Sequence, residues 1–355
     1  MTASAQGAAG CTREGDLARL AIFRADASAD IGTGHVQRCL TIARLLAING
    51  WTVGFAVTAA TVQAVPALAD PKFGKLIVGG RPDAEIELMK RQWPRGSDLL
   101  VVDHYQRNAD FETRARGWAR RIAAIDDLPS RAHDVDLLID AAAGRTANDY
   151  AGHVPAAAKV LAGVQYVMLR SEVVEARRPM GPAPATATQL FVSFGGSDPD
   201  DLTSRAIDAL DDDRLRAVQA TVVVGPANEK ADAIAKRARP NLRVVVDPPR
   251  LAEVMAGSDF ALAGSGTMAW ELAYLGVPSL LAVHSRGTVV EALTAAGAAR
   301  PLGRADDLSP EIIANAAAAL AKDRETRAAM AAAGRALIDG RGAARVANAL
   351  EELVR

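Results

Sequence analysis

The chain has 355 residues, half of them hydrophobic, which is enough for two domains because single cores rarely grow beyond about 250 to 300 residues. Its 41 basic and 42 acidic residues leave a net charge of −1, which argues against binding to nucleic acid or to an anionic membrane surface. The two cysteines, Cys11 and Cys39, lack metal-ligand or redox spacing, so we expect no metal, no cofactor and a small-molecule partner in a reducing cytoplasm.

The first half of the chain is predicted to be one Rossmann-like domain. Residues 1–16 are expected to be a disordered tail, since they lack the charged and apolar segments of a secretion signal. Residues 17–175 alternate short apolar runs with helical periods, as parallel βαβ units do. Strands are expected in LARLAIFRAD, WTVGFAVT, KLIVGG, DLLVVDHY, RIAAIDD and DLLID, and helices in HVQRCLTIARLLAING, DAEIELMKRQ and ADFETRARGWAR.

The second half repeats the alternation after a break. Residues 176–189 are rich in proline and poor in apolar residues, so they are the expected linker. Residues 190–355 are expected to form a second Rossmann-like domain whose alanine-rich tail, from Ser309, is helical and packs against the sheet. The predicted fold class is α/β, with two doubly wound domains facing a cleft at the carboxyl ends of their strands.

The first histidine of the chain lies where the first helix should begin. The segment GTGHV places Gly32, Gly34 and His35 at this helix start, and Gln37 breaks the G-x-G-x-x-G fingerprint of dinucleotide sites. A helix N-terminus disfavours a protonated ring, so the position suits a general base. The alternative is a histidine that only caps the helix or packs in its turn.

Polar residues also end two later strands of the first half. VVDHYQ places Asp103, His104 and Tyr105 at the expected carboxyl edge of the sheet, where one of them could orient a ligand or water. Asp126 and Asp127 end a neighbouring strand, but adjacent strand residues point to opposite faces, so we expect no metal between them.

Two glycine-rich turns precede helices in the second half. In FVSFGGSDPDDLT, Ser197 or Asp198 is expected as the helix N-cap, and in LAGSGTMAWELAYLGVP a carboxylate, Glu271, follows one helical turn after the start. Free amides at such starts bind phosphate oxygens, and a carboxylate there can accept hydrogen bonds from a ribose diol. The alternatives are tight packing for the turns and an exposed surface position for Glu271. The turns supply Gly195, Gly196, Ser265, Gly266 and Thr267.

Taken together, these segments resemble a known enzyme family. FRADASADIGTGHVQRCLTIARLL, VVDHYQ, LRSEV, FVSFGGSDPDDLT and SGTMAWELAYLGVP, in this order, resemble the UDP-2,4-diacetamido-2,4,6-trideoxy-β-L-altropyranose hydrolases of pseudaminic acid biosynthesis in flagellin-modifying bacteria. The resemblance spans roughly residues 20 to 300. It implies the GT-B fold of nucleotide-sugar glycosyltransferases and a UDP-sugar as substrate, with other enzymes of the sugar pathway as further partners.

The resemblance also implies roles for individual residues. His35 would activate the water that attacks the anomeric carbon, with Tyr105 lining the same site. Beside them, Gly32, Gly34 and Asp103 are expected to contact the substrate. The two glycine-rich turns would hold the diphosphate, and Glu271 the ribose. Arg170 and Glu172 match a similar pair in the family, although Val173 replaces the aromatic residue that follows it there. Ser285 and Arg286 stand where the family usually has Asn-Gln or a similar polar pair. Arg286 is expected to face the cleft and help hold the phosphates or a sugar carbonyl, and the alternative is a solvated arginine at a helix start.

The implied reaction is inverting hydrolysis of the UDP-sugar, with UDP leaving once the helix amides have neutralised its phosphates. Two other classes stay open. In a glycosyltransferase of the same fold, His35 would deprotonate a sugar or lipid hydroxyl, and an inactive nucleotide-sugar binding module would bind UDP and release nothing.

Overall fold

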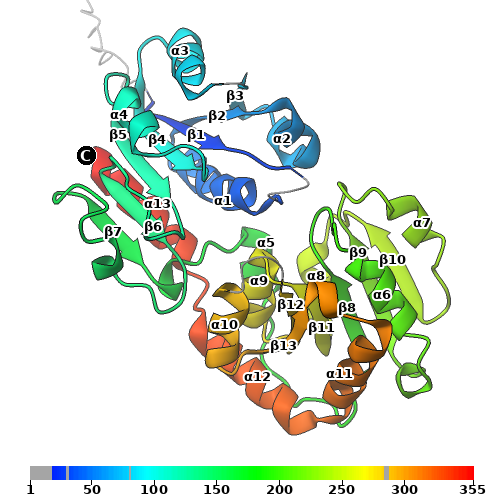
Figure 1. Cartoon of the computed structure of the whole chain (residues 1–355). Helices are drawn as coiled ribbons and strands as arrows, with labels where there is room; N and C mark the ends of the chain where they lie inside the picture. The colour runs from blue at the N-terminus through cyan, green and yellow to red at the C-terminus, as the bar shows by residue number, and fades with distance from the viewer. Residues whose placement is uncertain (1–17, 29–31, 80, 284–287) are drawn as a thin grey trace, which may run out of the picture.

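A computed structural model describes residues 18–28, 32–79, 81–283 and 288–355, which form two parallel sheets covered by helices (Figure 1). The order of strands in the first sheet is β3-β2-β1-β4-β5-β6-β7. Its strands are β1 (Leu20–Ala25), β2 (Thr52–Val57), β3 (Phe73–Ile77), β4 (Ser97–Asp103), β5 (Ala119–Ile125), β6 (Leu137–Asp140) and β7 (Lys159–Ala162). Its helices are α1 (Gly34–Ile48), α2 (Ala59–Ala64), α3 (Pro82–Gln92) and α4 (Ala109–Ala115).

The second sheet has the order β10-β9-β8-β11-β12-β13. Its strands are β8 (Gln189–Ser193), β9 (Gln219–Val224), β10 (Leu242–Val246), β11 (Phe260–Gly264), β12 (Ser279–Val283) and β13 (Ala299–Arg304). The helices of this half are α5 (Ser171–Ala176), α6 (Leu202–Ala209), α7 (Ala231–Ala235), α8 (Leu251–Ala256), α9 (Thr267–Leu275), α10 (Thr288–Ala295), α11 (Pro310–Lys322) and α12 (Arg324–Leu337). The last helix of the chain is α13 (Gly342–Val354).

Both sheets are buried on both faces, as parallel sheets usually are. Alternate residues of β1 pack into different cores: Phe23 lies in the core beneath α1, whereas Ile22 lies in the core with α3 and α4. Strand β11 alternates in the same way, since Leu262 faces α6 and α11 whereas Ala263 faces α9. The predicted class, two doubly wound α/β domains, is therefore confirmed.

The strand order of each sheet reverses at one point, and the candidate residues lie there. In the first sheet the reversal falls between β1 and β4. His35 lies in the helix that follows β1, and Asp103 is the last residue of β4. In the second sheet it falls between β8 and β11, which the two glycine-rich turns follow. Ligands of open α/β sheets bind at such crevices because the loops diverge to either side.

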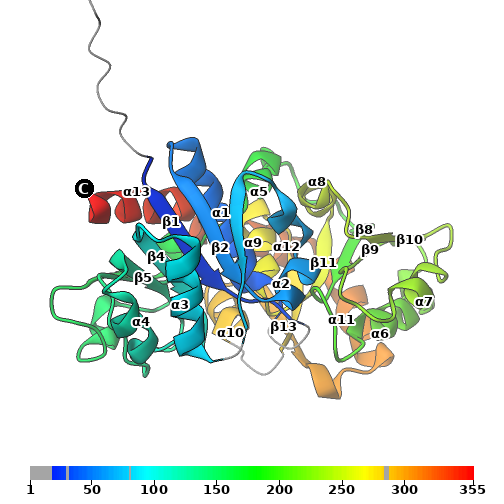
Figure 2. The same cartoon turned by 90° about the horizontal axis from the view of Figure 1, so that it is seen from above.

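The end of the chain differs from the expected domain boundary. Helix α13 packs against α1 and the first sheet, where Val346 and Leu350 are buried in the same core as Leu40 and Leu46 (Figures 1 and 2). Composition gave no sign of this return, because an alanine-rich amphipathic helix fits either sheet. The second domain therefore does not include the whole of residues 190–355.

The connection between the halves also differs in detail. Residues 177–188 form neither helix nor strand, in keeping with the expected linker. Val167 and Val173 already pack in the core of the second sheet, so the chain leaves the first domain before residue 175. Within the described chain, no helix combines the length and apolar character that crossing a bilayer requires.

Candidate functional site

His35 lies in the first turn of α1, at the carboxyl edge of the first sheet. Gly32 has a φ of +72°, a conformation that suits glycine, and Thr33 is the N-cap without a side-chain hydrogen bond to the helix. The side chain of His35 is 12% exposed, so part of the ring faces the solvent.

A buried carboxylate fixes the imidazole of His35. Asp103, with no exposed surface, lies with Oδ1 2.6 Å from His35 Nδ1, and Arg38 donates to both of its oxygens, from Nη2 to Oδ1 at 2.6 Å and from Nε to Oδ2 at 2.5 Å. Burial alone would raise the pKa of Asp103, but Arg38 and His35 outweigh it and hold the pKa well below its usual range. An ionised carboxylate only accepts, so in a neutral ring we place the proton on Nδ1 and the lone pair on Nε2, the arrangement that a general base requires.

Asp103 lies at the carboxyl end of β4, as expected. Its carboxylate has no exposed surface and is engaged by His35 and Arg38, so it is placed to orient the imidazole, and its contact with a substrate stays a prediction. Sequence reasoning missed Arg38, although its place three residues after His35 puts both on one helix face.

Tyr105 packs against the same imidazole. The two rings meet edge to face, with centroids 4.9 Å apart and planes at 86°. The phenol donates to Asp127, a residue that sequence reasoning examined only as half of an acidic pair. The expectation that the side chains of Asp126 and Asp127 point in different directions is confirmed. Asp127 faces Tyr105, whereas Oδ2 of Asp126 lies 2.7 Å from Nε2 of His133.

The glycine-rich turn after β8 touches the His35 loop but does not expose free helix amides. A Cβ on Gly196 would lie 3.5 Å from Cγ2 of Thr33, which shows how closely the two halves approach. Asp198, one of the two expected caps, accepts hydrogen bonds from the amides of Leu202 and Thr203 at 3.0 and 2.8 Å, while Asp201 is the N-cap residue of α6. The first amides of α6 are therefore already satisfied.

The turn after β11 leaves the start of α9 without a side-chain cap, and phosphate binding there stays a prediction. Gly266 is the N-cap residue of α9 and has no side chain to accept from the first amides. A Cβ on Gly34 would lie 3.3 Å from Cγ2 of Thr267, so the N-termini of α1 and α9 meet across the domain boundary. The positive ends of two helix dipoles converge here, and an anion placed between them is stabilised by both.

Glu271 lies one turn deeper in α9 and is paired with Arg170. The guanidinium donates to the two carboxylate oxygens from Nε and Nη2, each at 2.7 Å, and its Nη1 lies 3.4 Å from Glu172. Arg170 and Glu172, at the start of α5, thus form a side-chain cluster with Glu271 of α9. Each carboxylate oxygen retains capacity for a further donor, so ribose binding by Glu271 stays a prediction. Ser285 and Arg286 lie outside the described residues.

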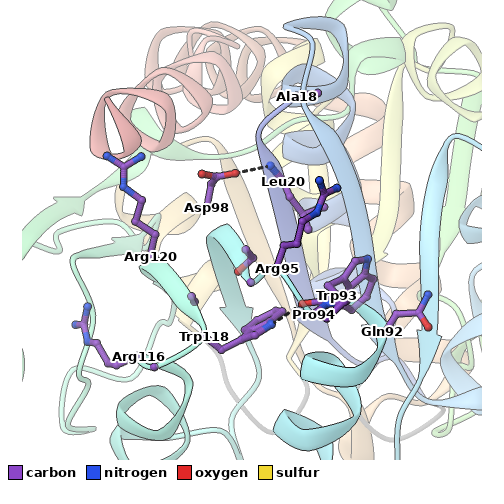
Figure 3. Close-up of a pocket in the computed structure, with 14 residues that line it drawn as sticks. Ala18, Leu20, Gln92, Trp93, Pro94, Arg95, Asp98, Arg116, Trp118 and Arg120 are labelled. Carbon is purple, nitrogen blue, oxygen red and sulfur yellow. Dashed lines mark hydrogen bonds between the residues drawn. The ribbon is translucent and has the colours of Figure 1, made fainter. Parts of the chain in front are cut away.

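A separate pocket of about 620 Å³ opens at the amino ends of the strands of the first sheet (Figure 3). Its lining residues include Trp93, Trp118, Arg95 and Arg120, near the start of β4 and β5. Ser97 begins β4 and Asp103 ends it, so this pocket is about 20 Å from the predicted site at roughly 3.3 Å per residue. None of the predicted site residues lines it.

Comparison with known proteins shows which fold this is. No family model matches the chain. In structure, it is similar to MurG of Acinetobacter baumannii, with a TM-score of 0.63, 15% identity and coverage of 94% of this chain and 99% of that one. It is equally similar to S. aureus MnaA solved with UDP, with a TM-score of 0.63, 13% identity and coverage of 94% and 96%. The chain has the GT-B fold.

In sequence, the chain is similar to a nucleotide-sugar hydrolase. It is 25% identical over 239 residues, 67% of this chain and 82% of the relative, to the UDP-2,4-diacetamido-2,4,6-trideoxy-β-L-altropyranose hydrolase of Campylobacter jejuni. The resemblance drawn from the motifs is thereby confirmed.

Proposed function

We propose that the protein hydrolyses a UDP-activated diacetamido-trideoxyhexose to free sugar and UDP, as a step of pseudaminic acid biosynthesis for flagellin glycosylation. One observation carries the proposal: His35, oriented by Asp103, lies beside the point where the N-termini of α1 and α9 meet. The similarity to the Campylobacter jejuni hydrolase supports the sugar.

In the proposed reaction, Nε2 of His35 takes a proton from water, whose oxygen then attacks the anomeric carbon as the bond to UDP breaks. The proton ends on His35, where Asp103 stabilises the imidazolium. The diphosphate leaves as an anion stabilised by the amides at the start of α9, so no strong general acid is needed. A single displacement inverts the anomeric configuration.

The alternative function is glycosyl transfer to a sugar or lipid hydroxyl, which is favoured by the GT-B glycosyltransferases among the structural neighbours. Both reactions use the same base and the same leaving group. They differ in the nucleophile, so incubation with a panel of UDP-sugars and no acceptor separates them.

The test is release of free sugar and UDP, with the anomeric configuration of the first product followed by NMR. Hydrolysis predicts stoichiometric release of both, and His35→Ala is expected to lower turnover by about 10² to 10⁴ while UDP affinity stays nearly unchanged. His153→Ala is the matched control, because His153 lies after β6, outside the site. Absence of release from every UDP-sugar in the panel, with UDP still bound, would rule out hydrolysis.

A further inference from the structure

Tyr105 is held from two sides by residues that the proposed reaction does not use. Its phenol donates to both carboxylate oxygens of Asp127, at 3.0 and 3.2 Å. The guanidinium of Arg131 lies over its ring, 6.0 Å from the centroid. Arg131 is itself fixed by Asp126 at 3.1 Å and by the carbonyl of Arg107 at 3.1 Å. The ring is therefore confined at its hydroxyl end and on one face.

The confined ring in turn confines the base. Asp103 holds His35 at Nδ1, and a bond at a single atom leaves the imidazole free to tilt about that atom. The edge-to-face contact with Tyr105 restricts this tilt. A base must keep its lone pair within hydrogen-bond reach of the attacking water, so a tilt at the ring translates into lost rate.

Asp127 differs from the other acidic residues around the site in how little else it binds. Among the described residues, its side chain has no ion pair, and the hydrogen bonds it receives come from Tyr105. It is half-buried at the end of β5, beside β4, which carries Asp103 and leads into Tyr105. Its charge also acts on Arg38: burial opposes the charged form, but Asp103 and then Asp127 raise the pKa of Arg38.

We propose that Asp127 is a positioning residue for His35 and acts through Tyr105: its carboxylate anchors the phenol, and the ring keeps the imidazole aimed at the cleft. The proposal rests on the proposed role of His35 as the base. It assigns Asp127 no contact with the substrate.

The experiment is a double-mutant cycle with Asp127→Ala and Tyr105→Phe in the full-length protein. Each single variant is expected to lower kcat by about 10- to 100-fold with KM nearly unchanged, as for residues that orient a catalytic group. Because both act through one contact, the double variant should lose no more than the more impaired single variant. Asp127→Asn keeps an acceptor for the phenol and should recover most of the loss. Asp110→Asn, at an exposed position in α4, is the matched control.

A second measurement does not depend on turnover. In protein labelled with ¹⁵N-histidine, and assigned with His35→Ala, the ring signals of His35 should broaden or shift in Asp127→Ala and stay close to wild type in Asp110→Asn. If no UDP-sugar is turned over, the proposed function fails while this spectrum still tests the link between Asp127 and His35.

Three results would overturn the proposal. Additive losses in the double variant would show that Asp127 and Tyr105 act separately. A raised KM with unchanged kcat in Asp127→Ala would make Asp127 a substrate-binding group. Unchanged His35 signals in Asp127→Ala would show that the contact does not orient the ring.

Discussion

Gly34 in α1 and Thr267 in α9 lie so close across the boundary between the two domains that a Cβ added to Gly34 would be 3.3 Å from Cγ2 of Thr267. The missing side chain of Gly34 therefore helps to set the spacing between the two helix N-termini. Because an anion between these termini gains from both dipoles only at short range, this spacing bears directly on the proposed chemistry.

Gly34→Ala is expected to separate activity from stability. Alanine is favoured over glycine in a helix by about 0.5 to 1 kcal/mol, so the free energy of unfolding should stay the same or rise. Turnover should fall by about 10-fold or more, since small displacements of reacting groups are costly. Turnover and urea unfolding measure the two effects.

Gly117→Ala is the control for this variant, because an added Cβ there meets nothing within 4 Å. Adding Thr267→Ser to Gly34→Ala removes Cγ2 and should restore part of the turnover. Wild-type turnover in Gly34→Ala alone would show that the observed spacing has no role in the reaction.

Asp103→Asn is expected to impair the base through its tautomer. An amide can donate to Nδ1 and so place the imidazole proton on Nε2, which removes the acceptor for water; loss of a general base costs about 10² to 10⁴ in rate. UDP affinity should be nearly unchanged. The variant also leaves Arg38 without its ionised partner, at a cost of up to about 3 to 5 kcal/mol in stability, so unfolding must be measured beside turnover.

Asp98→Asn serves as the comparison, since Asp98 lies near the other end of β4 and accepts from the amide of Leu20. It should lose some stability and keep its turnover. Equal turnover in Asp103→Asn and Asp98→Asn would remove Asp103 from the proposed mechanism.

Glu271→Ala tests the predicted ribose contact with two nucleotides. A lost hydrogen bond to a charged group costs about 1.5 to 3 kcal/mol, so the affinity for UDP should fall by about 10- to 100-fold. The affinity for 2′-deoxy-UDP, which lacks one hydroxyl of the diol, should fall less. Calorimetric titration of both nucleotides gives the comparison.

The double variant Arg170→Ala with Glu271→Ala controls for the unpaired guanidinium that the single variant leaves behind. The difference between the two nucleotides should persist in it. An equal loss of affinity for UDP and 2′-deoxy-UDP would make the pair structural.

The environment of His133 predicts that the free energy of unfolding depends on pH. It is buried between Asp126 and Glu112, and although burial opposes the charged form, these carboxylates raise its pKa to about 9. A base whose pKa is raised in the folded state stabilises the fold fully below its unfolded pKa of about 6.5. This contribution, on the order of 3 kcal/mol at most, should be lost as the pH rises from about 6.5 to about 9.

Urea unfolding across this pH range measures the loss, and His133→Gln should flatten the curve. His153→Gln alters a histidine whose carbonyl accepts from the amide of His133 but whose side chain is not part of this cluster, so it should leave the slope in place. A wild-type curve that stays flat between these pH values would contradict the raised pKa.

The strands of the fold and the polar residues at their ends could be predicted because each is a local pattern. An apolar run such as DLLVVDHY marks β4 and places Asp103 at its carboxyl end without reference to the rest of the chain. Strands β7 and β13 were missed because their runs are short and interrupted by polar residues, Gly or Pro.

The pairing of side chains at the site could not be predicted in the same way. Sequence suggested Ser197 or Asp198 as the cap after β8, but only the fold shows that Asp201 is the N-cap residue of α6 while Asp198 binds the amides of Leu202 and Thr203. Only the fold shows, too, that Arg170, 101 residues away from Glu271, binds that carboxylate. Arg38 was within reach of sequence reasoning through its spacing from His35. The contact between Tyr105 and Asp127 could be recognised only once β4 and β5 were known to be neighbours in the sheet.

The return of α13 to the first sheet has a consequence for the order in which the protein can mature. The first domain leaves the ribosome early, but the core around Leu40 and Leu46 stays open until Val346 and Leu350 have been synthesised. Domains generally fold as units during synthesis, N-terminal first, but here the first domain lacks part of its core until the last helix has been made. The apolar surface of the first domain that α13 covers therefore stays exposed while the second domain is synthesised.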